Sequence, residues 1–594
     1  MAIDKFKRAI DLDPNFLPAK NNLANSYKAI GNFEKAEFYY KDVLKIKPNY
    51  IQALNNYANL KALIFDYNSA IELYKEALNI KENDETILFT LANAYHAIGQ
   101  THKTKEIAEK ILKLNPKHVS AHKLLSSITD YSKDQSNIDQ MEGIILNKDL
   151  SEELDLNFSS SSNYELSALF SGNLLPEGSE SIAQAYAGHQ FGHFTMLGDG
   201  RAVMMGEHIS KKNERFDIQF KGSGKTPFSR NGDGRAALGP MLREYIVSEA
   251  MHYLNIPTTR SLAVVKTGED VIRENTLQGA ILTRVASSHL RVGTFQFIAT
   301  RNKENELKTL IDYTINRHYP NIRQSKNQAL ELLKVLIEQQ TNLVINWMRV
   351  GFIHGVMNTD NMAISGETID YGPCAFMDIY NPQTVFSSID QFGRYSYANQ
   401  PSITKWNLAR FAECLIPLID PNKDKAIEIA TETINGFDKN YEIKWINMMR
   451  DKLGLFGQDP KDIVLILDLL TWMHKNKADY TNTFCFLMNE NIPNNKIYSD
   501  KNFLVWKKRW EERLKLNNNT PNKFLKLMRS VNPLIIPRNH KVEEALEAAN
   551  NNDLNSIKKL AKVLEKPYEK TQENTDYQSP APISNKKYQT FCGT

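Results

Sequence analysis

The 594-residue chain has few cysteines, almost no net charge and no long apolar run. Its four cysteines form no Cys-x-x-Cys pair, which excludes a disulfide framework or a zinc ribbon and predicts a reducing, cytoplasmic location. No stretch of roughly twenty residues is apolar throughout, so we expect no membrane-spanning helix. The charged segment from Met1 to Arg8 does not resemble a signal peptide. With 73 basic and 69 acidic residues, the net charge of +4 gives no electrostatic reason to bind nucleic acid or a membrane.

Residues 1–129 contain an internal repeat with a period of 34 residues. Turn-forming pairs recur at this interval, at Pro14-Asn15, Pro48-Asn49, Glu82-Asn83 and Pro116-Lys117. Small residues keep the same spacing, at Ala24, Ala58 and Ala92. Gly31 and Gly99 are two periods apart, with Phe65 in the position between them. This helix–turn–helix period is the signature of tetratricopeptide repeats, which stack into a solenoid with a concave groove.

Such a groove predicts a peptide or protein partner, although the repeats would also serve to extend the fold or to mediate self-association. Candidate ligand-contacting asparagines on the expected first helices are Asn21, Asn22, Asn25, Asn55, Asn56, Asn59 and Asn93. The array opens with Phe6–Ile10, which has the pattern of a second helix without its first, so we expect that upstream repeats are missing. Residues 130–163 are dense in Ser, Asn and Asp, which predicts a linker and an irregular entry into the next domain.

From Gln184 onward the chain is punctuated by glycine. Gly198, Gly200 and Arg201 stand at the start of two expected strands, 201–207 and 216–220. A glycine-rich turn beside strands lets backbone N–H groups approach phosphates. Glycine turns also arise for steric reasons alone, so this motif by itself is weak.

A lysine and a glutamate follow in positions that suit a nucleotide site. Lys221 ends the second expected strand, and Glu244 lies in a segment with a helical pattern that runs to Tyr253. In kinase-like folds, a strand lysine paired with a helix glutamate points its ammonium at the ATP phosphates. The alternative is a surface salt bridge worth less than about 1 kcal/mol. The glycine-rich connection between them holds Asp233 and Gly234 and is a candidate loop for contacting a phosphate or a base.

Two arginines, Arg284 and Arg291, are seven residues apart, which corresponds to two turns if the segment is helical. Two guanidinium groups on one side of a helix would clamp a triphosphate and spread its negative charge. Solvated surface arginines are the alternative.

The segment His354–Asn361, followed by Asp370-Tyr371-Gly372, has the length and the ends of a protein-kinase catalytic loop and its metal site. Val356 replaces the aspartate that accepts the proton of the substrate hydroxyl in kinases. Asn361 and Asp370 offer the oxygen ligands that magnesium prefers. Asp360 is the only carboxylate in the loop, so it is the candidate base. A cap of the following turn is the alternative for Asp360, and His354 is expected to be structural.

In this order, the motifs of the second domain resemble selenoprotein O, the family that includes the bacterial YdiU group. The resemblance is carried by Gly198-Asp199-Gly200-Arg201, Lys221-Gly222, Asn231-Gly232-Asp233-Gly234-Arg235, Thr283-Arg284 to Arg291, His354-Gly355-x-x-Asn358-x-Asp360-Asn361 and Asp370-Tyr371-Gly372-Pro373. It covers the chain from about Ser171 to the C-terminus. It implies a pseudokinase fold that transfers AMP, not phosphate, from ATP to Ser, Thr or Tyr hydroxyls of proteins.

The resemblance also implies a role for each matching residue. The residues that would bind ATP are Gly198, Gly200, Arg201, Lys221, Asp233, Gly234, Arg284, Arg291 and Asp370, with Glu244 in support. Asp360 would accept the proton, and Asn361 with Asp370 would hold Mg²⁺ or Mn²⁺. ATP would be flipped relative to kinases, so that its α-phosphorus meets the acceptor hydroxyl. Cys592 lies near the end of the chain, where eukaryotic members carry selenocysteine, and is a candidate redox-active thiol.

These interpretations together predict four segments. They are an all-α tetratricopeptide solenoid (1–129), a linker (130–163), an α+β two-lobed kinase-like pseudokinase domain (164–560) and a C-terminal tail (561–594). Helical periodicity from Leu330 onward predicts the second lobe. The repeats are not part of the usual family pattern, which suggests that they recruit protein partners. The alternatives to adenylyl transfer are a catalytically silent ATP-binding scaffold and a phosphoryl-transferring kinase.

Overall fold

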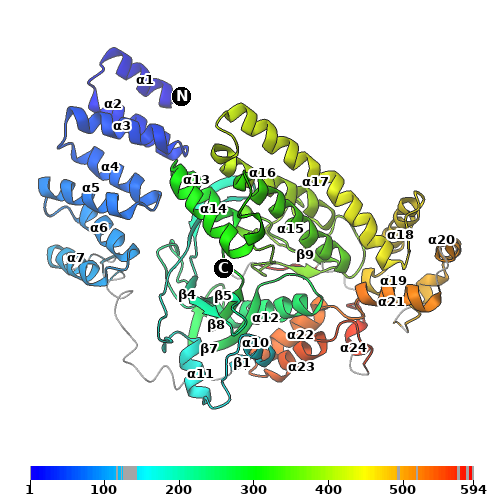
Figure 1. Cartoon of the computed structure of the whole chain (residues 1–594). Helices are drawn as coiled ribbons and strands as arrows, with labels where there is room; N and C mark the ends of the chain where they lie inside the picture. Colours follow the sequence, from blue (N-terminus) through cyan, green and yellow to red (C-terminus); the bar gives the residue numbers. More distant parts are fainter. Residues whose placement is uncertain are drawn as a thin grey trace. The chain divides into compact units, whose positions relative to one another are not determined.

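The computed structural model describes residues 2–115, 118, 120–121, 124, 144–490, 492, 495–516, 520–571, 575–582 and 588–591. The chain divides into two compact units (Figure 1). The repeat unit comprises Met1–Asp134 together with Lys225–Arg230, and the α+β unit comprises Gln135–Gly224 together with Asn231–Thr594.

The repeat unit is a succession of helices joined by short turns, blue in Figure 1. Its described helices are α1 (Ala2–Leu12), α2 (Leu17–Ala29), α3 (Phe33–Ile46), α4 (Ile51–Leu63), α5 (Tyr67–Ile80), α6 (Glu85–Ala97) and α7 (Thr101–Leu114). First helices begin at Leu17, Ile51 and Glu85, and second helices keep the same interval. The repeat period predicted from the sequence is therefore confirmed.

Small residues allow the paired helices to pack closely. Ala24, Ala58 and Ala92 are completely buried. At the ends of the first helices, Gly31 and Gly99 have φ of 77° and 72°, and Phe65 takes the same left-handed conformation with φ of 59°. A side chain at such a position costs backbone free energy, so glycine is the favoured residue there.

Several of the repeat asparagines are used inside the array. Tyr40 Oη donates a hydrogen bond to Asn25 Oδ1 at 2.6 Å, and Tyr74 Oη donates to Asn59 Oδ1 at 2.7 Å, one period later. Asn56 Nδ2 donates to Asn21 at 3.2 Å. These contacts tie helices together, which gives the asparagines a structural role whatever the groove binds.

The α+β unit is built on an antiparallel sheet with the strand order β1-β7-β8-β5-β4, to which β6 adds by pairing with β8. Its strands are β1 (Ile144–Leu146), β4 (Ala202–Ile209), β5 (Arg215–Lys221), β6 (Ala236–Ala237), β7 (Arg260–Ile272) and β8 (Thr276–Ala286). The two strands expected at 201–207 and 216–220 are β4 and β5, which confirms them. Two smaller antiparallel pairs are β2 (Ala185–Gln190) with β3 (His193–Gly198) and β9 (Phe352–Ile353) with β10 (Ala375–Phe376).

One helix connects the sheet to the C-terminal part of the chain. α12 (Leu238–Tyr253) packs on β7 and β8, and α22 (Asn539–Asn550) and α23 (Asn555–Leu564) cover it, as Figure 1 shows. The apolar core of this layer includes Leu242, Ile246 and Leu560, all nearly inaccessible to solvent. α12 therefore has fixed partners on both sides, which holds Glu244 in place.

The rest of the α+β unit is helical, as the periodicity from Leu330 onward predicts. Its described helices are α13 (Val292–Ala299), α14 (Glu304–His318), α15 (Gln328–Val350), α16 (Gln400–Ile419), α17 (Lys423–Lys452), α18 (Asp462–Asn476), α19 (Tyr480–Leu487), α20 (Lys501–Leu514) and α21 (Pro521–Val531). Two apolar cores hold them together, one around α13–α17 and one that joins α15 to α18–α21. None of the helices in the described parts of the chain has the length and apolar character needed to cross a bilayer.

One expectation about an irregular segment is corrected. Residues 144–163, assigned to a linker, contain β1 and α10 (Lys148–Glu153), because Ile145, Leu150 and Leu154 are buried against the sheet. They are followed by α11 (Asn163–Phe170). In the tail, α24 (Thr575–Gln578) ends at the buried Gln578, and Thr590 pairs with Ser387 and is buried as well.

Candidate active site

Strand register brings the first site residues together. In the β5–β8 pair, Gln219 lies directly opposite Arg284, and Lys221 lies two residues further along β5 on the same face. Arg284 Nη1 donates to Gln219 Oε1 at 3.1 Å. The sheet therefore presents an ammonium and a guanidinium side by side.

Glu244 on α12 holds both of these cations. Its Oε2 lies 2.6 Å from Lys221 Nζ, and its Oε1 accepts from Arg284 Nε and Nη2 at 2.9 and 2.5 Å. All three side chains are almost fully buried. Burial by itself would raise the pKa of Glu244, but the charges of Arg284 and Lys221 outweigh it and hold that pKa below its usual value. The lysine–glutamate pair is thus a buried one, not the solvated alternative.

Asp370 joins the same group of charges from the loop after β9. Its Oδ1 accepts from Arg284 Nη2 at 2.7 Å and from Lys221 Nζ at 3.1 Å, and its Oδ2 lies 3.5 Å from Arg291 Nη1. Although burial acts in the opposite direction, these three cations hold the pKa of Asp370 well below its usual range. Its backbone is left-handed, with φ of 64°, a strained conformation that its charge contacts stabilise.

Arg291 extends the group of cations towards the loop that carries Asp360. It donates from Nη1 to the backbone oxygen of Asp360 at 3.1 Å, and Asp199 lies 3.8 Å from its Nη2. Its guanidinium lies over the Tyr186 ring at 4.6 Å. The helical segment considered for Arg284 and Arg291 is wrong, because Arg284 is in β8 and Arg291 is the extended residue before α13. The two guanidinium groups nevertheless meet, at Asp370.

Asp360 lies in the short 3-10 turn η3 (Thr359–Asn361) and is buried. Its Oδ1 has no hydrogen-bond partner among the described residues. Burial raises the pKa of Asp360 to about 6, against the opposing charge of Arg291. Two glycines make room for this turn: a Cβ on Gly188 would lie 2.5 Å from Asp360 Oδ1, and one on Gly293 would lie 2.2 Å from the Ala187 carbonyl oxygen.

The neighbours of Asp360 in the loop are fixed by backbone contacts. Asn361 Nδ2 donates to the Val356 carbonyl at 2.9 Å, and its amide oxygen accepts no hydrogen bond within the described part of the chain. His354 contacts the Ile369 carbonyl at 2.9 Å, which joins the loop to the segment before Asp370 and supports its structural role. In the structure, Asn361 and Asp370 are therefore carried by connected segments.

Other predicted residues lie around this group rather than in it. Gly198, Gly200 and Arg201 form the turn from β3 into β4. The Asp233 carboxylate is half-exposed and makes a two-pronged ion pair with Arg273, at 2.9 and 3.1 Å, so the structure does not bring it to the buried cations. Gly234 accepts a hydrogen bond from the Gly224 backbone N–H, which closes the glycine-rich loop. Cys592 lies outside the described residues.

A cavity of about 440 Å³ opens beside these charges. Lys221, Glu244 and Arg201 line one side of it, and residues 588–591 of the tail line another. This volume lies within the usual range for small-molecule sites. The cavity therefore offers room for a polyphosphate next to Lys221, whereas Arg284, Arg291 and Asp360 are not among its lining residues.

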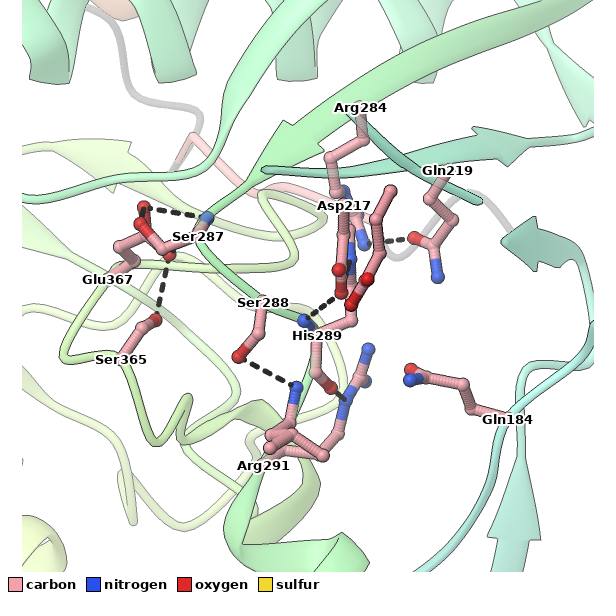
Figure 2. Close-up of polar contacts among 12 residues, drawn as sticks. Gln184, Asp217, Gln219, Arg284, Ser287, Ser288, His289, Arg291, Ser365 and Glu367 are labelled. Carbon is pink, nitrogen blue, oxygen red and sulfur yellow. Dashed lines mark hydrogen bonds and ion pairs between the residues drawn. The ribbon is translucent and has the colours of Figure 1, made fainter. Parts of the chain in front are cut away.

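A second polar network fixes the segment between Arg284 and Arg291 (Figure 2). The backbone N–H of His289 donates to Asp217 Oδ2 at 2.8 Å, and its Nδ1 lies 3.2 Å from the same oxygen. Glu367 accepts from Ser287 Oγ at 2.9 Å and from Ser365 Oγ at 2.7 Å. Burial raises the pKa of Glu367 to about 7.

Sequence reasoning missed four contributors to the site: Tyr186, Gly188, Asp199 and Gln219. Gln219 was predictable from the sequence, because it stands two residues before Lys221 in a strand and therefore lies on the same face. Asp199 stood between the two glycines of the first motif. No sequence pattern pointed to Tyr186 or Gly188, since their roles depend on where the β2–β3 hairpin packs.

Several buried cations surround one carboxylate, and a second carboxyl lies beside them. Such a site is suited to binding a polyphosphate and transferring one of its phosphate-containing groups. Comparisons with known proteins specify this further: the α+β unit is that of a nucleotidyltransferase. Residues 127–565 match the family described as protein adenylyltransferase SelO, and the chain belongs to this family. Residues 17–50, 66–99 and 86–118 match tetratricopeptide repeats.

Curated relatives carry names that agree with this family. The chain is 68% identical over 451 residues to "Protein nucleotidyltransferase YdiU" of Pelagibacter ubique, covering 76% of this chain and 93% of that protein. The proteins of the same name from Nitrosococcus oceani and Syntrophotalea carbinolica are 58% and 54% identical, with 92% of each covered. Among solved structures, the crystal structure of MamA aligns with 21% of this chain and 74% of its own at 20% identity, with a TM-score of 0.20.

Proposed function

We propose that the α+β unit transfers AMP from ATP to Ser, Thr or Tyr hydroxyls of proteins. The observation that carries this proposal is the position of Asp360. Its buried Oδ1 has no hydrogen-bond partner among the residues that the structure describes, and its backbone is held by Arg291, the cation that also approaches Asp370. A proton acceptor thus stands at the end of a row of phosphate-binding cations. Family membership supports the same reaction.

The chemistry follows from this order of residues. The acceptor hydroxyl oxygen forms a bond to the α-phosphorus of ATP while the bond from that phosphorus to the bridging oxygen breaks, and pyrophosphate leaves. The hydroxyl proton passes to the Asp360 carboxylate. Lys221 and Arg284 bind the departing phosphates, and Arg291 stabilises the charge on the reacting phosphate. Of these three cations, only Arg291 contacts Asp360.

The proposal includes an ATP orientation that is reversed relative to that in kinases. A kinase presents the γ-phosphorus to its catalytic aspartate, and Val356 occupies the position of that residue. When the triphosphate is reversed, its outer phosphates occupy the cluster of Lys221, Arg284 and Asp370. The base then needs to stand where Asp360 is. The absent kinase base is therefore consistent with a different reacting phosphorus.

The donor set fits a hard divalent ion. The Asn361 amide oxygen accepts no hydrogen bond within the described residues, and Asp370 has a partly exposed carboxylate. Such oxygens suit Mg²⁺ or Mn²⁺. Among the described residues, no group of three His, Cys, Asp or Glu side chains is able to hold a metal, so ATP would supply the remaining ligands. When bound, the ion neutralises charge on the triphosphate.

The repeat unit would bring protein acceptors to the enzyme. Stacked tetratricopeptide repeats present a groove that binds peptide segments. Recruitment by the repeats would select acceptors without any change in the chemistry at Asp360.

The position of the labelled phosphate in ATP distinguishes AMP transfer from phosphate transfer. Incubation with α-labelled ATP and Mg²⁺ or Mn²⁺ should label protein, whereas γ-labelled ATP should not. Asp360→Asn should lower transfer by about 10²- to 10⁴-fold, because it removes the proton acceptor. The same variant should keep its ATP-induced rise in Tm. Asp468→Asn, which changes an exposed aspartate on α18, is the matched control and should transfer AMP normally.

The opposite results are equally clear. Labelling from γ-labelled ATP would indicate an ordinary kinase. ATP binding without transfer to any protein, including the enzyme itself, would indicate the catalytically silent scaffold. Normal transfer by Asp360→Asn would remove Asp360 from its role as base.

A further inference from the structure

A group of aromatic and cationic side chains lies next to the Asp360 loop and has no part in the chemistry described so far. The guanidinium carbons of Arg394 and Arg410 lie 4.9 and 5.0 Å from the centre of the Trp406 ring. The His189 ring meets the edge of Trp406 at 5.2 Å. We call these four residues the Trp406 cluster.

The Trp406 cluster is joined to both sides of the Asp360 turn. The backbone N–H of His189 donates to Thr359 Oγ1 at 2.7 Å, and its neighbour Gly188 is the glycine that touches Asp360. On the other side, Tyr395, which follows Arg394, donates from Oη to Asn358 Oδ1 at 2.7 Å. A segment that places a hydroxyl at Asp360 therefore passes close to this cluster.

The positive charge of the cluster is only partly neutralised. Arg410 Nη2 lies 2.7 Å from Glu413, but Arg394 forms no ion pair within the part of the chain that the structure describes. The Nε atoms of both arginines are buried and lack acceptors among the described residues. Burial and then the charges of Arg410 and Arg394 lower the pKa of His189. Two like charges over one indole ring repel each other, and an anion between them would relieve that repulsion.

Exposed apolar side chains adjoin these charges. Phe392 is 97% exposed, two residues before Arg394, and Phe194 is 43% exposed and contacts the His189 ring at 5.1 Å. Arg410 also lines a largely apolar groove of about 700 Å³ between α13–α14 and α16–α17. Exposed apolar surface beside a charged site is typical of protein-binding surfaces rather than of sites for a free ion.

We propose that the Trp406 cluster binds an acidic side chain of the acceptor protein, close in sequence to the hydroxyl that is modified. This inference rests on the proposed adenylyl transfer and names its substrate class: hydroxyl residues with a nearby Asp or Glu. Arg394 and Arg410 bind the carboxylate, and the apolar groove beyond Arg410 takes the following residues of the acceptor. The cluster thus acts in selecting acceptors and not in the transfer itself.

Peptides with a single hydroxyl residue, flanked by glutamate, alanine or lysine, test this proposal with the full-length enzyme. AMP transfer is measured as a mass increase at saturating ATP and metal. The wild type should transfer to glutamate peptides with a kcat/KM about tenfold above that for alanine peptides, mainly through KM. Arg394→Ala should remove this preference. Arg394→Glu should reverse it in favour of lysine peptides, a result that a merely structural role would not produce.

Two controls separate the possible causes. Arg509→Ala, which changes an exposed arginine paired with Asp468, should keep the wild-type preference. The KM for ATP should be the same in Arg394→Ala as in the wild type. If that KM rises while the peptide KM does not, the cluster binds the nucleotide and the proposal is overturned.

Two further outcomes would overturn the proposal. Equal transfer by the wild type to glutamate, alanine and lysine peptides would overturn the acidic preference and leave adenylyl transfer intact. No transfer of AMP to any peptide, to any protein or to the enzyme itself would overturn adenylyl transfer and with it this inference.

Discussion

Asp360 is buried and Asp370 is partly exposed, and their surroundings change their acidity in opposite directions. Asp370 touches three cations, and its pKa lies well below the usual range. Asp360 has a buried Oδ1 that lacks a hydrogen-bond partner in the described parts of the chain, and its pKa is raised to about 6. Environments that separate the pKa values of two neighbouring carboxyl groups are typical of active sites with divided roles. Asp370 is suited to remain an anion among cations and ligands, and Asp360 is suited to exchange a proton.

A single methyl group should test the geometry around Asp360. Gly188→Ala places a Cβ 2.5 Å from Asp360 Oδ1, so the carboxylate has to turn away from its position. Because the atom that moves is the end of a side chain, we expect Tm to stay nearly unchanged while AMP transfer falls at least about tenfold. Gly436→Ala, in a helix with open space around it, is the control and should keep full activity. Normal transfer by Gly188→Ala would show that Asp360 does not need this position.

Glu367 should make stability depend on pH. Its folded pKa of about 7 lies above the ordinary value of 4.5, so folding favours the protonated form. This contribution is fully present below about pH 4.5 and is lost as the pH rises through 7; it is on the order of 3 kcal/mol. We expect the Tm of the wild type to fall relative to that of Glu367→Gln as the pH rises from 5 to 8. Parallel Tm profiles of the two proteins would contradict the raised pKa.

At the scale of elements, the site is an assembly of pieces that are distant in sequence. The sheet supplies Lys221 and Arg284, α12 supplies Glu244, and the loops around β9 supply Asp360 and Asp370. The C-terminal tail adds a further support: Thr590 Oγ1 donates to the Pro373 carbonyl at 2.6 Å. The same carbonyl leaves no room for a side chain on Gly355, so the tail, the Asp370 loop and the Asp360 loop meet at one point.

Thr590→Val should therefore weaken the connection between the tail and the two loops. The change keeps the size of the side chain but leaves the buried Pro373 carbonyl without this donor, which we expect to cost about 1–3 kcal/mol of unfolding free energy. AMP transfer should fall with it, since the Asp370 loop loses a fixed point. Thr309→Val, which alters an exposed threonine bonded within α14, should change stability by less than about 0.5 kcal/mol. Equal effects of the two variants would show that the tail contact is unimportant.

On the scale of the whole molecule, we propose that catalysis and acceptor choice belong to separate units. The curated relatives align over 92–93% of their own length with 76% of this chain, which leaves little length in those proteins for a repeat array. We therefore expect the α+β unit to carry out its chemistry without the repeats. We infer that the repeats narrow the choice of proteins that it modifies.

Removal of residues 1–129 should separate the two roles. The remaining chain should transfer AMP to small peptides within about threefold of the full-length rate, because no residue of the proposed site is removed. In a mixture of cellular proteins, the full-length enzyme should label a few acceptors strongly, and the shortened enzyme should label these less. The isolated repeat unit, added in excess, should compete for the same acceptors. An unchanged labelling pattern would show that the repeats do not recruit acceptors.

The repeat array and the order of the site motifs were readable from the sequence. The interval that separates Ala24, Ala58 and Ala92 follows from local helix packing, which each repeat reproduces. Lys221 and Glu244 were predictable as a pair because strand and helix patterns identify each element. The left-handed φ of Phe65, by contrast, follows only from its equivalence to the two glycines.

By itself, the sequence determined the repeats, the α+β class and the residues available for catalysis, since periodicity and short motifs depend on neighbours along the chain. Only the tertiary structure decided that Arg284 and Arg291 meet at Asp370 from a strand and a loop, that Asp233 pairs with Arg273, and that the tail packs beside Pro373. These contacts join residues far apart in sequence. They depend on strand register and on the packing of loops against one another, which no local pattern encodes.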